Sequence, residues 1–319
     1  MRSQAMKSID RVVRAVAAKE VTLTLIGESG TGKEMIARRA HELSARRLGP
    51  FVPINCAAIP DALFESEVFG HERGAFTGAS ARAKGKIEAA DRGTLFFDEI
   101  GEMPLHMQAK LLRFLEGLRF MRVGGTTKIQ ANVRLIFATL RPLEEEVRAG
   151  RFRDDLFYRI QGITVHVPAL RERRADIAPL LRQLLAQLSA HHGERPPRLS
   201  RQAKALLLAH SWPGNVRELR NVVETLCLLR PGRQVRAADL PESVRSQPGR
   251  EPQPKSAKPG AVLTLSLDDG LESLTHQLVE AALAIEGGNK VRAAARLKVS
   301  LRTIQRYVAS GSVRLPSSG

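Results

Sequence analysis

Short apolar runs alternate with helical patterns over the first half of the chain. The spacing of Ile9, Val12, Val13 and Val16 predicts an amphipathic helix near the start. Runs rich in β-branched or other apolar residues predict strands at residues 22–26, 51–54, 94–97, 133–138 and 163–167. Because helical patterns separate most of these runs, we expect an α/β domain with a parallel sheet over residues 1–167.

Only helical spacing follows Pro168. Three helices are expected, at residues 177–188, 200–210 and 215–227, and Ser200 is a suitable N-cap for the second. They predict a small all-helical subdomain over residues 168–245. Prolines, glycine and charges then predict a semi-extended linker over residues 246–261. Helical periodicity returns at the end and predicts a small all-α domain over residues 262–319.

The length and the charge narrow the class of protein. A chain of 319 residues is too long for one ordinary core, and its 43% of hydrophobic residues can bury several. The net charge of +17 indicates a polyanionic partner, either nucleic acid or an anionic membrane surface. An Arg-rich surface from a biased genome would give the same excess, so charge alone does not decide between these alternatives.

The cysteines and the apolar stretches indicate the compartment. Cys56 and Cys227 lie far apart and lack metal-ligand spacing, so we expect free, buried thiols in a reducing compartment. The N-terminus has no apolar signal region, and no stretch approaches the ~18 apolar residues of a membrane span. We therefore expect a cytoplasmic protein that does not enter a membrane.

The run Gly27-Glu28-Ser29-Gly30-Thr31-Gly32-Lys33 follows a predicted strand and precedes a predicted helix. This is the context of a Walker A phosphate loop. The glycines let backbone N–H groups form an anion nest, and the helix N-terminus adds partial positive charge. Lys33 would reach the β- and γ-phosphates. Glu34 stands where such loops usually carry a Ser or Thr hydroxyl for Mg²⁺, so the general motif is imperfect.

Residues 94–99 form an apolar strand that ends in Asp98 and Glu99, as in a Walker B motif. Asp98 would hold Mg²⁺, directly or through water, and Glu99 would polarise the attacking water. Many strands end in two acids at the surface, so the run is weak evidence alone. About sixty-five residues after Lys33, it becomes a strong indication of ATP hydrolysis.

Five segments within the first 245 residues carry a more specific pattern. They read GESGTGKE from Gly27, FVPINCAA from Phe51, ESEVFGHERGAFTGA from Glu65, DEIGEMPLHMQAKLLR from Asp98 and WPGNVREL from Trp212. Together they closely resemble the AAA+ domain of sigma-54-dependent, NtrC-like enhancer-binding activators. The resemblance implies a P-loop AAA+ parallel sheet with a helical lid subdomain, covering nearly all of residues 1–245.

The hexapeptide Gly74-Ala75-Phe76-Thr77-Gly78-Ala79 is the most specific part of the resemblance. In that family this loop contacts sigma-54 and moves with the nucleotide cycle. The small residues around Phe76 disfavour a helix or strand, so the loop could present one aromatic ring to a partner. The ordinary alternative is a Gly/Ala loop tip with Phe76 tucked into the core.

The resemblance also implies roles for four polar residues. Asn55 matches the asparagine that restrains the Walker B glutamate, although it could simply make a turn bond. Arg153 and Arg159 match arginine fingers, which enter the neighbouring subunit's ATP site and so require an oligomer; ion pairs with Asp154 and Asp155 are the alternative. Arg217 matches the sensor II arginine of the lid, with a bond to Glu218 or solvent as the alternative.

Two positions depart from the family. The strand that ends at Thr139 normally continues with Asn, which contacts the γ-phosphate or the lytic water, but here Leu140 follows. Because Leu offers neither hydrogen bond, we expect ATP to bind normally and to be hydrolysed slowly. Arg92 stands where a glycine usually precedes Gly93, which should affect only a turn.

The last residues predict a helix-turn-helix. A helix is expected over residues 289–297, a turn at Lys298 and Val299, and a second helix over residues 301–308. The second helix would enter the major groove, with these candidate DNA contacts: Ser300, Arg302, Thr303, Gln305 and Arg306. Seven basic residues and no acidic one follow residue 288. The segment resembles the Fis-type domain that ends most family members, although Lys298 and Leu301 depart from its pattern.

These features predict an ATP- and Mg²⁺-dependent motor that remodels sigma-54 RNA polymerase from a double-stranded enhancer site. The resemblance implies a homo-oligomeric ring, with six subunits expected. One alternative is a DNA-binding regulator with weak or lost ATPase activity, acting as a repressor or partner subunit. Another is a generic AAA+ remodeller, such as a helicase-type ring. Because the phosphate loop begins at Gly27, we expect no N-terminal sensory domain: either another protein supplies control or the chain is incomplete.

Overall fold

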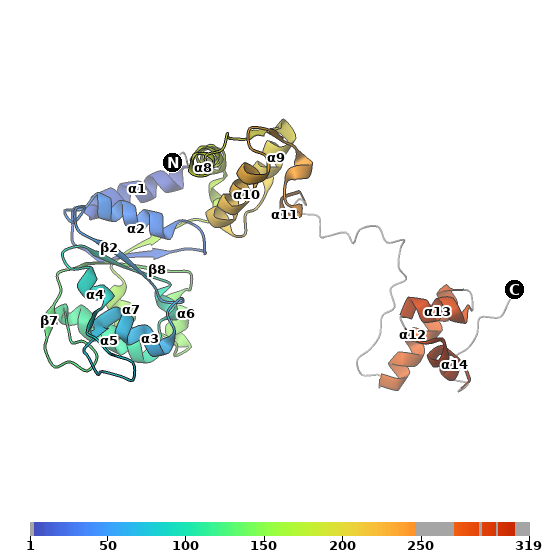
Figure 1. Cartoon of the computed structure of the whole chain (residues 1–319), viewed down its shortest axis with the longest axis horizontal. Helices are drawn as coiled ribbons and strands as arrows, with labels where there is room; N and C mark the ends of the chain where they lie inside the picture. Colours follow the sequence, from blue (N-terminus) through green and yellow to red (C-terminus); the bar gives the residue numbers. More distant parts are fainter. Residues whose placement is uncertain (1–2, 246–270, 287–288, 298, 310–319) are drawn as a thin grey trace. The chain divides into compact units, whose positions relative to one another are not determined.

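The computed structural model describes residues 3–245, 271–286, 289–297 and 299–309. The chain divides into two compact units, residues 1–249 and 250–319 (Figure 1). The predicted linker over residues 246–261 lies outside the described residues. No helix in the described part of the chain has the length and apolar character that crossing a membrane requires.

The first unit is built on a sheet of five parallel strands in the order β2-β5-β8-β1-β9. The strands are β1 (Leu23–Ile26), β2 (Phe51–Asn55), β5 (Thr94–Asp98), β8 (Arg134–Thr139) and β9 (Ile163–His166). These are the five predicted strands, and the predicted parallel α/β sheet is confirmed. Because all strands run the same way, the loops after β1, β5 and β8 meet at one edge of the sheet.

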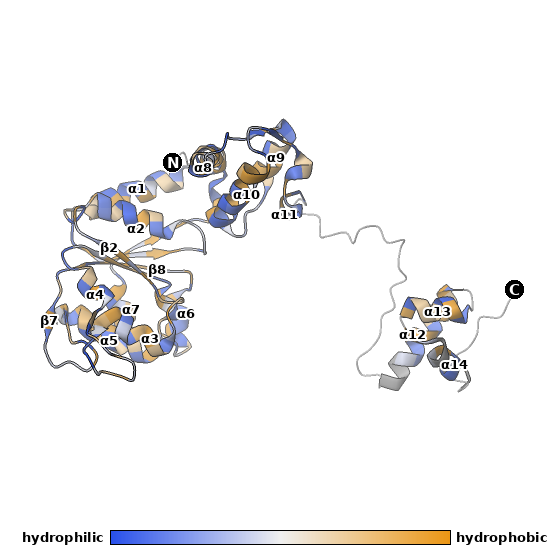
Figure 2. Ribbon diagram, in the orientation of Figure 1, coloured by the Kyte–Doolittle hydropathy of each residue, from blue (hydrophilic) through white to orange (hydrophobic). Residues whose placement is uncertain are grey.

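Helices cover both faces of this sheet (Figure 1). One face carries α1 (Gln4–Ala17) and α2 (Lys33–Glu42). The other face carries α3 (Asp61–Phe69), α4 (Lys86–Ala89), α5 (Leu105–Gly117), α6 (Leu143–Arg148) and α7 (Asp154–Ile160). Side chains alternate along β8, so Phe137 packs on one face and Ile136 on the other. This explains why the strands read as apolar runs, which Figure 2 shows in orange.

Two small hairpins lie outside the main sheet, and the sequence patterns did not predict them. In the first, β3 (Gly70–His71) pairs antiparallel with β4 (Ala83–Lys84). In the second, β6 (Arg119–Phe120) pairs antiparallel with β7 (Ile129–Gln130). A bridge between His71 and Val123 connects the two hairpins. The first hairpin therefore holds the base of the segment that contains residues 74–79.

The lid follows β9 and has a hydrophobic core of its own. It is mainly helical, as predicted, but not all-helical, because residues 198–199 and 234–235 form a short parallel strand pair. Its elements are η2 (Leu170–Asp176), α8 (Ile177–His191), β10 (Arg198–Leu199), α9 (Arg201–Ala209), α10 (Asn215–Leu229), β11 (Gln234–Val235), η3 (Ala237–Asp239) and α11 (Glu242–Arg245). The predicted cap is present, since the Ser200 hydroxyl accepts a hydrogen bond from the Ala203 N–H at 3.1 Å. Trp212 is fully buried at the centre, and its Nε1 donates to the Leu207 carbonyl at 3.0 Å.

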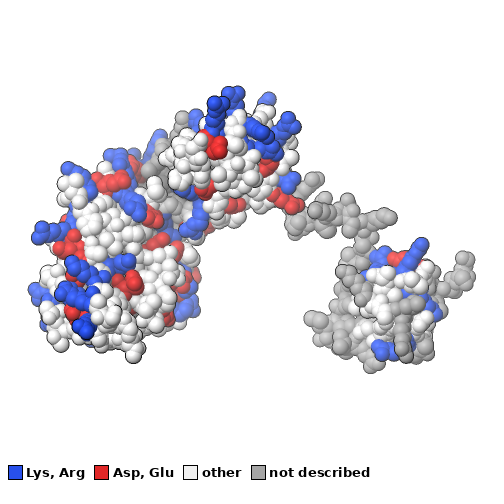
Figure 3. Space-filling view, viewed as in Figure 1, with Lys and Arg blue, Asp and Glu red and all other residues white. Residues whose placement is uncertain are grey.

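The second unit contains α12 (Leu271–Ile285), α13 (Lys290–Leu297) and α14 (Leu301–Ala309). Its small core includes Leu283, Ala293 and Ile304. Ser300 caps α14, because its hydroxyl accepts from the Thr303 N–H at 3.2 Å. On the face drawn in Figure 3, Lys and Arg side chains gather over the lid and also appear on this second unit.

Candidate nucleotide site and partner surfaces

The phosphate loop turns from β1 into α2 through two glycines with positive φ, Gly30 (74°) and Gly32 (97°). Lys33 begins α2, and its side chain is only 6% exposed. Its ammonium donates to the carbonyl oxygens of Gly27 (2.8 Å) and Glu28 (3.4 Å) and contacts Glu99 Oε1 at 3.2 Å. The loop therefore places a cation beside the acidic end of β5.

Asp98 is the last residue of β5, an inner strand of the sheet, and Glu99 follows it. Burial, and secondarily the charge of Glu99, raise the pKa of Asp98, while Lys33 opposes the shift. Glu99 has a left-handed backbone, with φ of 52°, and its Oε2 accepts the Leu140 N–H at 3.0 Å. Both ends of the Glu99 carboxylate are thus held, one by Lys33 and one by the end of β8.

Asn55 ends β2 directly beside Asp98 in the sheet register. Its Oδ1 accepts the Ala57 N–H at 3.0 Å, which is the turn bond that the sequence left as an alternative. Among the described residues, no hydrogen bond joins Asn55 to Glu99. In this structure Glu99 is held by Lys33 and by Leu140 instead.

Glu34 is exposed on α2 and forms an ion pair with Arg38, one turn further along, at 2.7 Å. This pairing satisfies its carboxylate away from the buried Lys33. No cluster of three metal-ligating side chains occurs among the described residues. Asp98 therefore stays the candidate for holding Mg²⁺, and phosphate oxygens or water would have to supply most of the other ligands.

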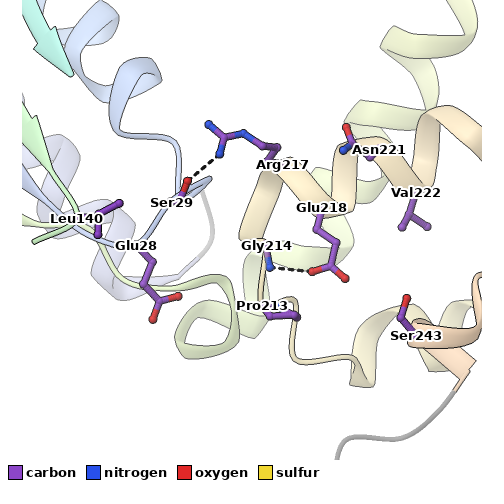
Figure 4. Close-up of a pocket in the computed structure, with 10 residues that line it drawn as sticks. All are labelled: Glu28, Ser29, Leu140, Pro213, Gly214, Arg217, Glu218, Asn221, Val222 and Ser243. Atoms are coloured by element: carbon purple, nitrogen blue, oxygen red, sulfur yellow. Dashed lines mark hydrogen bonds between the residues drawn. The ribbon is translucent and has the colours of Figure 1, made fainter. Parts of the chain in front are cut away.

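A cleft of about 590 Å³ opens where the lid meets the phosphate loop (Figure 4). Arg217 lies on its lid side, and its Nη1 donates to the Ser29 hydroxyl at 2.7 Å. Leu140 lines the opposite side and is 45% exposed. The sensor-like arginine of the sequence analysis thus reaches the phosphate loop, whereas an apolar side chain occupies the strand-end position.

A second cavity, of about 440 Å³, lies between α1, the phosphate loop and the lid. Its lining is largely apolar and includes Met6, Ile9, Val13, Leu180 and Val216. Thr31 and Gly32 border it on the phosphate-loop side. An apolar cavity of this size beside a phosphate loop could hold the planar base of a nucleotide whose phosphates lie in the loop.

Arg153 directly precedes α7, and Arg159 lies in the last turn of that helix. Arg153 is exposed and pairs with Asp155 at 2.7 Å, and Arg159 Nη2 donates to the Leu115 carbonyl at 2.9 Å. Arg159 also lines a cavity with Thr22, which precedes β1, so it lies at the amino end of the strands. The phosphate loop follows the carboxyl end of β1, about 13 Å away along four residues. Neither arginine contacts its own phosphate loop in the described structure.

The loop at residues 74–79 projects from the β3–β4 hairpin. Gly74 and Gly78 have positive φ (81° and 104°), and the Gly74 N–H donates to the Ala79 carbonyl at 2.9 Å. Phe76 is 42% exposed and its ring meets the His71 ring edge-on, with centroids 5.0 Å apart. Thr77 is exposed at the tip. Phe76 is therefore not part of the core, and the ordinary alternative of the sequence analysis does not describe this loop.

On the second unit, Gln305 and Arg306 are exposed on α14. Thr303 is half-buried, and its N–H donates to the exposed Ser300 cap. Arg302 belongs to the same helix, but its side chain lies outside the described residues. The polar candidates thus share the first two turns of one short helix.

Four groups that hold the phosphate loop, Glu99 and the start of the lid in place were not expected from the sequence. They are the Leu140 backbone N–H and the side chains of Arg171, Arg173 and Asn215. Arg173 is only 6% exposed and donates from Nη2 to the Thr31 carbonyl at 2.6 Å. The sequence contains a charged run at residues 171–174 and an Asn inside WPGNVREL. Neither feature indicates which phosphate-loop residue it bonds to.

Comparison with known proteins agrees with this geometry. The family model described as the sigma-54 interaction domain matches residues 1–166, and the AAA+ ATPase lid domain matches residues 171–257. The regulatory protein AtoC of Escherichia coli (strain K12) is 41% identical over 302 residues, which are 95% of this chain and 65% of AtoC. The Nif-specific regulatory protein of Enterobacter agglomerans is 46% identical over 306 residues, 95% of this chain and 58% of that protein.

Solved structures show the same fold. NtrX from Brucella abortus, in complex with ATP, superimposes with a TM-score of 0.72 at 35% identity, covering 97% of this chain and 68% of that one. Hsp104, at 16% identity and a TM-score of 0.51, shares the fold alone. The chain spans about two thirds of the length of AtoC, at 65%. On these matches, the chain belongs to the sigma-54 interaction domain family of NtrC-like, sigma-54-dependent activators.

Proposed function

We propose that this protein is an ATP-hydrolysing transcription activator that remodels the sigma-54 RNA polymerase holoenzyme from an enhancer DNA site. The observation that carries the proposal is the 3.2 Å contact between Lys33 and Glu99. It brings a phosphate-binding cation and a water-polarising carboxylate into one site. Residues 27–33 would cradle the phosphates, and the apolar cavity beside Met6 and Ile9 would take the base.

Mg²⁺ suits this site. Asp98 is a partly buried carboxylate whose pKa is raised by burial, and a nearby cation would stabilise its charged form. When bound, Mg²⁺ would neutralise charge on the phosphates. Glu34 is paired with Arg38, so we do not assign it to the metal. Asn55 would reach Glu99 only after leaving its turn bond to Ala57.

Arg153 and Arg159 would act on the ATP of a neighbouring subunit. The place of Arg159 near the amino end of the strands supports action in trans, because the chain's own phosphate loop lies at the opposite edge of the sheet. A guanidinium that enters a neighbour's site stabilises the charge of the transferring phosphoryl group. The proposal therefore includes a homo-oligomeric ring, with six subunits expected, and Arg217 of each lid facing its own phosphates.

The loop at residues 74–79 would contact sigma-54. Its exposed Phe76 and Thr77, on a glycine-flanked turn, support this role. The helices of the second unit would bind duplex DNA, with α14 in the major groove and Ser300, Gln305 and Arg306 among its contacts. Thr303 and Arg302 complete the proposed recognition set.

One observation favours a second candidate function. Leu140 puts apolar surface into the cleft beside Ser29 and Arg217, where a polar side chain could act on phosphate or water. The alternative is a DNA-binding regulator with weak ATPase activity, serving as a repressor or partner subunit.

The two functions are separated by measuring ATP turnover together with open-complex formation at a sigma-54 promoter. The proposed activator forms open complexes only with hydrolysable ATP, and Glu99→Gln abolishes both activities. A protein that binds enhancer DNA and sigma-54 but forms no open complex would support the regulator instead.

A further inference from the structure

Glu28 is the second residue of the phosphate loop, where a carboxylate would repel bound phosphates if nothing compensated its charge. Its Oε2 accepts hydrogen bonds from Arg171 Nη1 at 2.8 Å and from Asn215 Nδ2 at 3.1 Å. Arg171 belongs to η2, where the lid begins, and Asn215 is the first residue of α10. One carboxylate of the phosphate loop therefore contacts two separate segments of the lid.

Asn215 extends this junction. It is fully buried, and its Nδ2 also donates to the Ser29 carbonyl at 3.0 Å. Its Oδ1 accepts the Leu170 N–H at 2.7 Å, which ties the two lid segments to each other. The next residue, Val216, donates its N–H to the Gly30 carbonyl at 2.9 Å. The lid is thus bonded to three successive residues of the loop.

The approach of the lid also explains the glycine at position 30. A Cβ added to Gly30 would lie 2.5 Å from the Gly214 carbonyl oxygen and 3.0 Å from Arg217 Cβ. Only glycine fits between loop and lid at such distances. Arg217 follows directly in α10 and donates to Ser29 (Figure 4). Its position relative to the phosphates therefore depends on how α10 is fastened.

We infer that Glu28 is a positioning residue: with Arg171 and Asn215 it fastens the lid to the phosphate loop and so places Arg217 at the nucleotide phosphates. The inference rests on the proposed ATPase function. The hydrogen bond from Arg171, then that from Asn215, lowers the pKa of Glu28 to about 2. The carboxylate is consequently charged across the neutral range, and the fastening does not depend on pH there.

A direct role of Glu28 at the nucleotide predicts the opposite behaviour. If the carboxylate faced the phosphates, Glu28→Gln would remove a repulsion and tighten ATP binding. If it fastens the lid, the same change loosens Arg217 and weakens ATP binding. The sign of the effect on the KM for ATP therefore distinguishes the two roles.

The kinetic test compares Glu28→Gln, Arg171→Gln and the double variant. Each single change should raise the KM for ATP about three- to tenfold, since the ion pair is half-exposed. The kcat should change less, because Lys33 and Glu99 keep their places. The double variant should be no worse than the worse single one. Arg174→Gln, exposed on the same η2, is the matched control and should leave KM unchanged.

Amide exchange in the absence of nucleotide gives a readout that does not need activity. The N–H groups of Leu170 and Val216 are both bonded within the junction, so their exchange should quicken about tenfold in Glu28→Gln and stay unchanged in Arg174→Gln. Unchanged exchange, or a lowered KM, would overturn the inference. If the wild type hydrolyses no ATP while the exchange result holds, the proposed ATPase function fails and the fastening role stands.

Discussion

The backbone N–H of Leu140 donates to the carboxylate of Glu99, with 3.0 Å between the nitrogen and Oε2. The bond uses the main chain, so it does not depend on which side chain stands at position 140. It leaves the leucine side chain in the cleft, 45% exposed, beside Ser29 and Arg217. Position 140 therefore orients the glutamate through its backbone but offers no polar group to the phosphates or the water.

Leu140→Asn should raise kcat for ATP at least about tenfold, with little change in KM. The amide restores a group that can donate to phosphate and accept from water, and such contacts act mainly in the transition state. Steady-state turnover at saturating ATP measures this. Leu63→Asn, an equally exposed leucine on α3, is the control. Fast turnover in the wild type with no gain in the variant would show that another residue, such as Thr139, does the sensing.

Lys33→Ala should weaken ATP binding about tenfold to a hundredfold, because one charge-assisted contact with the phosphates is lost. The change also removes the cation at 3.2 Å from Glu99. Titration with a fluorescent ATP analogue measures the affinity. Lys204→Ala, exposed on α9, should bind as the wild type does. An unchanged affinity in Lys33→Ala would mean that residues 27–33 are not the nucleotide site.

Arg159→Ala should lower ATP turnover by about a thousandfold or more without lowering ATP affinity. If Arg159 acts on the ATP of a neighbouring subunit, two inactive variants should complement each other in a mixed ring. Mixing inactive Arg159→Ala with inactive Glu99→Gln should recover up to about a quarter of wild-type turnover, because random rings contain some intact pairs. Reassembled Arg159→Ala alone is the control. No recovery in rings shown to be mixed would place the arginine's action within its own subunit or outside catalysis.

Thr77→Ala should leave ATP turnover within about twofold of wild type and reduce open-complex formation at a sigma-54 promoter below about a tenth. Thr77 is exposed at the loop tip, and no described contact joins it to the phosphate loop. Ser80→Ala removes a nearby exposed hydroxyl outside the hexapeptide and serves as the control. Normal open complexes with Thr77→Ala would contradict the proposed sigma-54 contact.

Removal of residues 262–319 should spare ATP turnover and abolish specific DNA binding. The second unit has its own small core, with Leu283 and Ile304 fully buried, and the first unit has cores of its own, so we expect the first unit to fold without it. The dependence of DNA affinity on salt concentration, measured between low and moderate salt, should also disappear, because contacts with the DNA phosphates set that dependence. Site-specific binding by the shortened chain would place DNA recognition in the first unit.

The sequence by itself determined the strands of the main sheet and their order along the chain, but not the short β3–β4 and β6–β7 hairpins. The five apolar runs became the five parallel strands, and Ser200 and Ser300 cap the helices that they precede. These features depend on the local spacing of apolar residues and on hydrogen bonds between residues three positions apart, so they can be predicted from the sequence. The phosphate loop and the acidic end of β5 were found in the same way, since each is one continuous run.

The tertiary structure decided which groups meet. Glu28 reads as part of a phosphate loop, yet its carboxylate bonds to Arg171, 143 positions further along the chain. The sequence indicates that Arg159 is either an arginine finger or an ion-pair partner, and only the sheet topology puts it at the edge opposite the phosphate loop. Glu99 could have been held by Asn55, but the adjacent β8 brings the Leu140 N–H to it instead. Such pairings depend on which segments the fold brings together, and this cannot be read from local spacing. Some also use backbone N–H groups, which nearly every residue has, so the sequence does not identify them.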